Sequence, residues 1–493
     1  MCATAPRAGR PLDRTDSTEV RRVRRFLCPL LLVALCANAT ASDVAERLAD
    51  YFGYCAENGM FNGAVLVKDD GETVYSGAFG IADPTTGEAL EVDSAFYLAS
   101  VSKQFTSMAA MVLAEAGELD LDDPLVKYFP GFEGFADDVR VHHLMQHTSG
   151  LPDHYRLLGG VPEGLDNERV RALLVEHGRL DFEPGAEYRY SNGGYVMLSM
   201  LVGKAGGASY REVLTERVLE PLGMQHTVVY DKTGPRVEKR AVGFRSGGAL
   251  DDYTIFTTGA GGMFSTVGDL ALWETGLDGL VSEEMLERAY TPPLLTGGGT
   301  SDYGFGWIVR NAGGKRLVTH SGGLAAFATY IIRDLGSRDA FIILSNRSDA
   351  LVDFGELTQS IAMILEGMSP ALPRIPISRV LQELIDAEGI DAALARYEEI
   401  WTSDATRYDL REGLLNELGY SYVTAGELDI AVAIFARNTE SYPRSSNPWD
   451  SLAEAQLLKG MKAEALENYR RAFELDPGNT NAAAIVARLE AEG

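Results

Sequence analysis

Ser100 and Lys103 stand three positions apart in a stretch, residues 97–110, whose pattern indicates the start of a helix. On an α-helix, positions i and i+3 share a face with Cβ atoms about 5–6 Å apart, so the serine hydroxyl can meet the lysine amine. A serine hydroxyl is a weak nucleophile at neutral pH, but an amine whose charged form is disfavoured by burial can accept its proton. The unpaired N–H groups of a helix start would favour a forming oxyanion. The pair predicts nucleophilic catalysis, although this spacing alone also arises by chance in many helices.

Two later stretches support this interpretation. Tyr190 and Asn192 form a Tyr-x-Asn motif, and His320 and Gly322 form a basic-residue-x-Gly motif. The three motifs, in this order and at these rough separations, resemble those of the penicillin-recognising serine hydrolases, which include class C β-lactamases, D,D-peptidases, D-aminopeptidases and related esterases. Supporting stretches that look like the same family lie at 146–153, 259–266 and 303–307, and the resemblance spans residues 43–367.

The resemblance implies a role for each residue of the first two motifs. Ser100 would attack a carbonyl carbon, while Lys103 and Tyr190 would share the proton transfers between the nucleophile and the leaving group. A tyrosine can serve in this way only if its pKa of about 10 is lowered, which a neighbouring lysine cation would do. Asn192 would orient Lys103 and donate a hydrogen bond to the amide of the substrate.

The third motif is expected to lie along the substrate. In the family, the oxyanion hole consists of the backbone N–H groups of the nucleophile and of a residue on the basic-x-Gly strand, here Ser100 and Gly323, the neighbour of Gly322. Each such donor is worth about 10²–10³ in rate. The resemblance implies no metal ion and no organic cofactor.

His320 is a departure from the family pattern, because β-lactamases and most D,D-peptidases have a lysine at that position. A lysine holds a permanent charge for a substrate carboxylate, whereas a neutral histidine can only donate a hydrogen bond. Histidine ordinarily changes charge near pH 6.5, so we expect KM for a carboxylate-bearing substrate to rise as the pH climbs through that value. This difference favours an esterase or a D-aminopeptidase-like enzyme over a true β-lactamase.

Two classes of function remain open. The first is a secreted serine hydrolase that cleaves an ester or amide of a small-molecule or peptide substrate through an acyl-enzyme. The second is a catalytically silent sensor of the same fold, which binds peptidoglycan fragments or a protein partner. The intact set of Ser100, Lys103 and Tyr190 favours the first, because a sensor has no physical need for a paired amine and phenol.

The composition limits the partners. The chain has 493 residues, of which 46% are hydrophobic, so it can bury a large core. Its formal net charge of −27 argues against nucleic acid or an anionic membrane surface as a partner.

Residues 1–41 are predicted to be a signal peptide. Arginines at 21–25 precede an apolar run at 26–37, and small residues at 39–41 follow, with cleavage expected near Ala41. The apolar run is shorter than the ~20 residues of a membrane span, so the mature protein is expected to have no span and to be secreted or periplasmic. The first twenty residues carry no structural signal and are interpreted as a surplus start.

The chain from 42 to 367 predicts an α+β domain. Helical spacing over 43–56 is followed by strand-like runs at 63–68 and 72–79, and further strand-like runs lie at 303–308, 316–320, 326–333 and 339–346. We expect the early and late strands to form one antiparallel sheet flanked by helices, with the α-rich lobe that carries Tyr190 inserted between them. A helix over 351–366 would close this β-lactamase/transpeptidase-like domain.

A proline-punctuated linker at 368–378 separates this domain from an all-α repeat region at 379–493. Large and small residues at 415–443 recur 34 residues later, as in tetratricopeptide repeats. A shortened copy at 380–400 and a capping helix at 480–490 are expected to complete the stack. Such repeats predict a protein or cell-wall partner.

Overall fold

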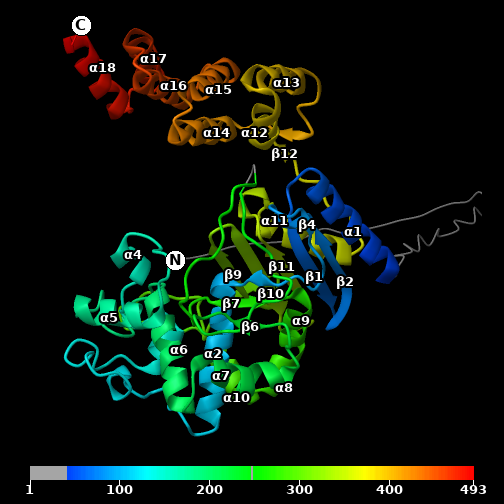
Figure 1. Ribbon diagram of the computed structural model, residues 1–493, viewed down its shortest axis with the longest axis vertical. Coiled ribbons are helices and arrows are strands. Elements are labelled where there is room, and N and C mark those ends of the chain that lie inside the picture. The colour runs from blue at the N-terminus through cyan, green and yellow to red at the C-terminus, as the bar shows by residue number, and fades with distance from the viewer. Residues whose placement is uncertain (1–40, 246–247, 493) are drawn as a thin grey trace, which may run out of the picture. The chain divides into compact units, whose positions relative to one another are not determined.

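The computed structural model describes residues 41–245 and 248–492 (Figure 1). The predicted signal peptide lies outside these residues except for Ala41, so the secretion of this protein stays a prediction. Over the described ranges, no helix combines the length and the apolar character that crossing a bilayer requires.

An antiparallel sheet forms the centre of the first part of the chain. Within the described residues it has six strands, in the order β2 (Glu72–Phe79), β1 (Gly63–Asp69), β11 (Ala340–Ser345), β10 (Phe327–Asp334), β9 (Lys315–Leu324) and β8 (Ile308–Ala312). Strand β1 pairs antiparallel with β11, with Val65 opposite Ile343. The expected pairing between the early and late strands is therefore confirmed.

Both faces of the sheet are covered, which explains why β1 reads as a continuous apolar run. Ala64 and Leu66 point into the core that contains α2 (Ser102–Glu115) and α9 (Val267–Gly276). Val65 and Val67 point to the opposite face and join the core beneath α1 (Ala41–Glu57) and α11 (Phe354–Leu365). The two-residue period of the strand thus divides its side chains between two helical layers.

The α-rich lobe lies between β2 and β8 in the sequence, as expected. Its remaining helices are α3 (Val141–Met145), α4 (His154–Leu158), α5 (Asn167–His177), α6 (Asn192–Gly206), α7 (Tyr210–Leu214), α8 (Glu220–Leu222) and α10 (Glu283–Ala289). Short strands accompany them: β3 (Ile81–Asp83), β4 (Glu88–Ala89), β5 (Phe96–Tyr97), β6 (Val228–Val229) and β7 (Met263–Ser265). Helix α2 is buried along almost its entire length, so it forms the axis on which the lobe and the sheet meet.

The predicted strand at 303–308 is wrong. Tyr303 and Ile308 form only an isolated bridge, and the segment between them turns back on itself through a hydrogen bond from Gly304 N–H to Trp307 O. Gly306 has a φ of +90°, and a Cβ there would lie 2.8 Å from the carbonyl oxygen of Lys103. Close packing against α2 requires glycine at this position and prevents an extended strand.

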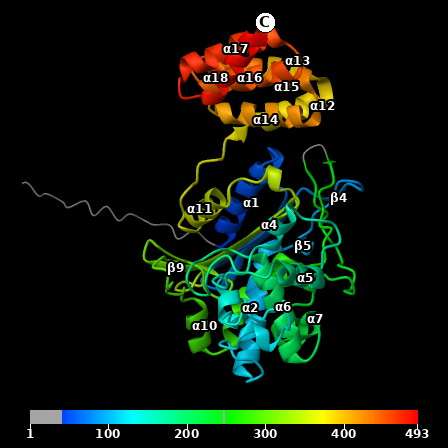
Figure 2. The same cartoon turned by 90° about the vertical axis from the view of Figure 1, so that its left-hand side faces the viewer.

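The C-terminal part is helical, in consecutive antiparallel pairs (Figure 2). The pairs are α12 (Ile377–Glu388) with α13 (Ile390–Ser403), α14 (Glu412–Ala425) with α15 (Leu428–Ser441), and α16 (Ser446–Leu458) with α17 (Lys462–Leu475), followed by α18 (Thr480–Glu492). Two short parallel strands, β12 (Ile375–Pro376) and β13 (Tyr408–Asp409), pair near the first of them.

Small residues allow these helices to pack closely. A Cβ on Gly419 of α14 would lie 2.4 Å from the ring of Phe435 on α15, so glycine is required where the two helices meet. The helices occupy the ranges that the repeat pattern indicates. Their assignment as tetratricopeptide repeats, and the domain boundaries at 367 and 379, stay predictions.

Candidate active site

Ser100 lies at the N-terminal end of the buried helix α2. A short 3₁₀ helix, Ala99–Val101, carries it directly into α2, so the serine keeps its expected position one turn before Lys103. Ala99 has a φ of +47°, a left-handed conformation that costs a non-glycine residue about 1–2 kcal/mol. Backbone strain is therefore stored next to the half-buried Ser100, as is common at functional sites.

Lys103 is fully buried and brings the first two motifs together. Its Nζ lies 3.1 Å from Ser100 Oγ, 2.9 Å from Asn192 Oδ1 and 2.8 Å from the carbonyl oxygen of Ala260. These partners lie up to 157 positions from Lys103 in the sequence.

Burial disfavours the charged form of this amine. Loss of solvation lowers the pKa of Lys103 well below its ordinary value of 10.5, against a smaller opposing effect of the Asp153 carboxylate. A neutral amine has two N–H donors and one lone pair. In that form the amine would donate to the oxygens of Asn192 and Ala260, which can only accept, and its lone pair would be left for the Ser100 hydroxyl.

Tyr190 faces the same amine, because Lys103 Nζ lies 4.7 Å from the centre of its ring. The expectation that a lysine cation lowers the pKa of this phenol is wrong. Loss of solvation raises the pKa of Tyr190, and a hydrogen bond with Ser100 offsets this only in part. Tyr190 is therefore a neutral phenol, because burial disfavours its charged form.

Asn192 begins helix α6, and its amide has a defined orientation. Its Nδ2 and its backbone N–H both donate to Asp153 Oδ2, each at 2.8 Å, so its Oδ1 is the atom that faces Lys103. Asp153 was not singled out from the sequence, although it ends the stretch 146–153 that resembles the family. The sequence signal for Asp153 is its position immediately before helix α4, where an aspartate can act as the N-cap.

His320 is 2% exposed and has both ring nitrogens occupied. Its Nδ1 lies 2.6 Å from the carbonyl oxygen of Ser321 and must donate to it, so Nε2 accepts a hydrogen bond from the Tyr303 hydroxyl at 2.8 Å. Burial, with Lys103 nearby, lowers the pKa of His320 to about 3. The expectation that this residue changes charge near pH 6.5 is therefore wrong.

The glycines of the third motif let strand β9 pass beside the nucleophile. A Cβ on Gly322 would lie 2.3 Å from the carbonyl oxygen of Leu98 and 3.0 Å from the backbone nitrogen of Ser100, so no side chain fits there. Gly323 is the exposed neighbour, opposite Ala328 of β10. This approach brings the backbone of β9 next to that of Ser100, where the family pattern expects the oxyanion hole.

His147 is a further residue of the site that sequence reasoning did not assign. Its Nδ1 accepts a hydrogen bond from the Ser191 backbone N–H at 3.1 Å, and its ring centre lies 4.1 Å from that of Tyr190. Burial lowers its pKa well below 6.5, so the ring is neutral. In the part of the chain that the structure describes, no group of three or more His, Cys, Asp or Glu side chains is arranged to hold a metal ion.

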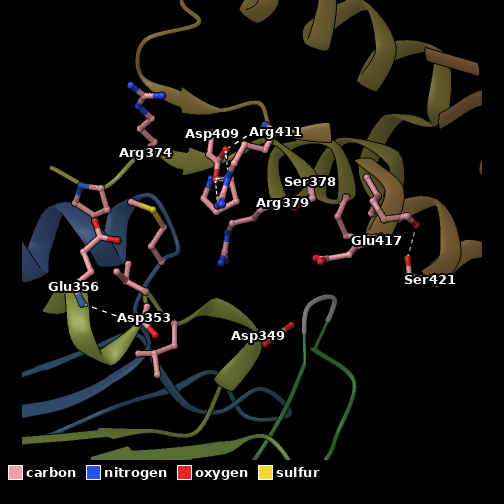
Figure 3. A pocket seen from close by; sticks show the side chains of 17 residues that line it. Asp349, Asp353, Glu356, Arg374, Ser378, Arg379, Asp409, Arg411, Glu417 and Ser421 are labelled. Carbon is pink, nitrogen blue, oxygen red and sulfur yellow. Dashed lines mark hydrogen bonds and ion pairs between the residues drawn. The ribbon is translucent and has the colours of Figure 1, made fainter. Parts of the chain in front are cut away.

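A pocket of about 810 Å³ lies away from this chemistry (Figure 3). Charged side chains line it, among them Asp353, Glu356, Arg374, Arg379 and Arg411. Its lining contains none of the catalytic candidates, so we assign it no part in the reaction.

Comparison with known proteins gives matches over the first two thirds of the chain. The family model described as Beta-lactamase matches residues 42–366. Penicillin-binding protein 4* of Bacillus subtilis (strain 168) is 32% identical over 360 residues, which are 68% of this chain and 79% of that protein. A D-aminopeptidase of Brucella anthropi is 32% identical over 274 residues, 53% of this chain, and the chain covers 51% of that relative, about half its length.

Solved structures match the same part of the chain. The octameric penicillin-binding protein homologue from Pyrococcus abyssi aligns with a TM-score of 0.57 and 28% identity, over 69% of this chain and 81% of that one. The D-amino acid amidase from Ochrobactrum anthropi SV3 aligns with a TM-score of 0.56 over 66% of this chain and 99% of that one, at 24% identity, which supports the fold alone.

Proposed function

Because the chain belongs to the Beta-lactamase family, we propose that it is a serine hydrolase that cleaves an ester or amide through an acyl-enzyme on Ser100. The family membership confirms the resemblance drawn from the motifs, and the antiparallel sheet with its helical layers confirms the expected α+β fold. The observation that carries the proposal is the environment of Lys103, whose buried Nζ lies within hydrogen-bond distance of Ser100 Oγ and of the oxygens of Asn192 and Ala260.

The proposed acylation moves one proton from Ser100 to Lys103. The Ser100 Oγ forms a bond to the substrate carbonyl carbon as its proton passes to the Lys103 Nζ. The carbonyl oxygen becomes an oxyanion, which the backbone N–H groups of Ser100 and Gly323 would stabilise. The neutral phenol of Tyr190 then gives its proton to the departing oxygen or nitrogen as it takes one from the Lys103 ammonium, so it never becomes a phenolate.

Deacylation repeats the transfer with water in place of the serine. Water loses a proton to Lys103 as its oxygen bonds to the acyl carbon, and the Ser100 oxygen leaves and takes that proton from the Lys103 ammonium. Each cycle returns the amine to its neutral form. No step needs Tyr190 as a phenolate, which agrees with the raised pKa of that side chain.

We infer that the substrate lacks a carboxylate next to the scissile bond. His320 stands where most D,D-peptidases and β-lactamases have lysine, and it offers neither a charge nor an unoccupied ring N–H. β-Lactams carry such a carboxylate, so β-lactamase activity is disfavoured. Simple esters and D-amino acid amides or peptides fit better, and the latter accord with the names of the D-aminopeptidase and D-amino acid amidase relatives.

The C-terminal helices are proposed to bind a protein or cell-wall partner. Their large and small residues recur with a tetratricopeptide-like period, and the structure forms helical pairs at those positions. Export is proposed on the charged, apolar and small-residue segments of 21–41.

A fluorophosphonate probe tests the catalytic proposal directly. We expect mass spectrometry to place the label on Ser100, and Ser100→Ala to abolish both labelling and hydrolysis of a small chromogenic ester. Ser102→Ala is the matched control, because this buried hydroxyl two residues away has no hydrogen-bond partner among the described residues. Ester hydrolysis at the wild-type rate in Ser100→Ala would contradict the proposal, and an unlabelled, inactive wild type would favour the silent sensor.

A further inference from the structure

We propose that Asp153 is a positioning residue of the reaction, whose carboxylate holds the Asn192 amide so that Oδ1, and not Nδ2, faces Lys103. The inference rests on the proposed function, because it concerns how the Lys103 amine is directed toward Ser100. Asp153 touches neither the nucleophile nor the expected substrate position, so it acts through its neighbour.

The Asp153 carboxylate connects two helices. Its Oδ1 accepts hydrogen bonds from the backbone N–H groups of Tyr155 and Arg156, at 2.9 and 3.4 Å, and so caps α4. Its Oδ2 accepts both the backbone N–H and the side-chain Nδ2 of Asn192, at the first position of α6. All four donors meet a group that can only accept, so an ionised carboxylate satisfies them together.

The orientation of the Asn192 amide decides what the lysine can do. With Nδ2 fixed on Asp153, Oδ1 accepts one N–H of Lys103 and Ala260 O accepts the other. If the amide turned over, Nδ2 would face the amine and could donate to its lone pair, which would then be unavailable to Ser100. Asp153 therefore keeps the base directed at the nucleophile.

The charge of Asp153 has a second, separable effect. It opposes the loss of solvation that lowers the pKa of Lys103, so removal of the charge should lower that pKa further.

Other titratable groups also surround the amine, and they come from several elements. These groups are His147 before α4, His154 within α4, Tyr190 and Tyr195 around the start of α6, and His320 on β9. Burial lowers the pKa of each histidine, to about 4 for His154 and about 3 for His320, so none of them adds a positive charge at neutral pH.

Asp153→Asn separates the capping role from the positioning role. Asparagine caps a helix about as well as aspartate, but its single carbonyl oxygen cannot serve both Asn192 and the α4 backbone. We expect kcat for a small ester to fall about 10- to 100-fold, as for other small misplacements of catalytic groups. Asp353→Asn is the matched control, since Asp353 caps α11 through Gly355 and Glu356 in the same way, and its kcat should stay within about twofold of wild type.

The pH profile distinguishes positioning from a general loss of structure. Because Lys103 must be neutral to act, kcat/KM should rise with pH through its pKa, and in Asp153→Asn this acidic limb should move to lower pH. A variant that was merely less well folded would lose activity without moving the limb. Circular dichroism verifies the fold, and Asp153→Ser, which retains a capping hydroxyl, replaces the asparagine variant if that variant does not fold.

A double-mutant cycle tests the route through Asn192. Once Asn192→Ala has removed the amide, adding Asp153→Asn should lower kcat by less than about twofold. Full additivity of the two losses, an unchanged kcat in Asp153→Asn, or an equal loss in the Asp353→Asn control would each overturn the inference. Failure of the proposed function would appear differently, as ester hydrolysis that survives in Ser100→Ala.

Discussion

The burial of His320 predicts that this protein loses stability in mild acid. In the folded state the pKa of His320 is about 3, whereas in the unfolded chain it is about 6.5. Because the pKa of His320 is lower in the folded state, the unfolded state binds more protons in acid. The stabilisation is therefore complete above pH ~6.5 and is lost as the pH falls toward 3. Acidification from pH 7 to pH 5 should lower the free energy of unfolding by about 2 kcal/mol through this one side chain.

The perturbation that isolates this contribution is His320→Gln, because glutamine cannot titrate. The variant should be less stable than wild type at pH 7, since its contacts with Tyr303 and Ser321 change. Between pH 7 and pH 5, however, the free energy of unfolding of the variant should fall by about 2 kcal/mol less than that of wild type. The difference between the two pH dependences, and not the absolute stability, carries the prediction.

Urea unfolding followed by tryptophan fluorescence measures both quantities, because Trp273 and Trp307 are buried in the core around α2. Thr319→Val is the control, since this neighbouring buried side chain on β9 donates a hydrogen bond to Ile331 O but does not titrate. It should lower stability equally at both pH values. If wild type and His320→Gln lose the same free energy on acidification, His320 is not held neutral by burial and the reasoning about its environment fails.

The remaining predictions concern the reaction. Lys103→Met should lower kcat for a small ester by about 10²–10⁴, measured against the Ser100→Ala background rate, because it removes the general base. Tyr190→Phe should lower kcat while leaving KM nearly unchanged in steady-state assays, since the phenol acts on the leaving group; a change in KM alone would contradict this. Gly322→Ala should destabilise the protein by about 1–3 kcal/mol in urea and reduce activity, because the new Cβ would lie 2.3 Å from Leu98 O. KM for a carboxylate-bearing ester should show no trend between pH 5.5 and 7.5 that depends on His320, since burial lowers its pKa to about 3; a trend abolished by His320→Gln would refute this.

Local patterns in the sequence determined much of the framework. The meeting of Ser100 and Lys103 follows from their three-residue spacing at a helix start, which any helix in that position would reproduce. The alternation of Val65 and Leu66 between two cores follows from the two-residue period of a strand, once helices cover both faces. The missed turn at 303–308 has a tertiary cause, because the proximity of α2 leaves no room for a side chain at Gly306.

What only the tertiary structure decided is the chemical state of the site. The order of the motifs could not reveal that burial lowers the pKa of Lys103, raises that of Tyr190 and lowers that of His320, because desolvation depends on every element packed around a group. Nor could it reveal the role proposed for Asp153, which lies 39 residues from Asn192 in the chain and reaches it only because the starts of α4 and α6 lie side by side. Residue types and spacing identified the groups that could react, whereas folding set which of them carries a proton and which way each one points.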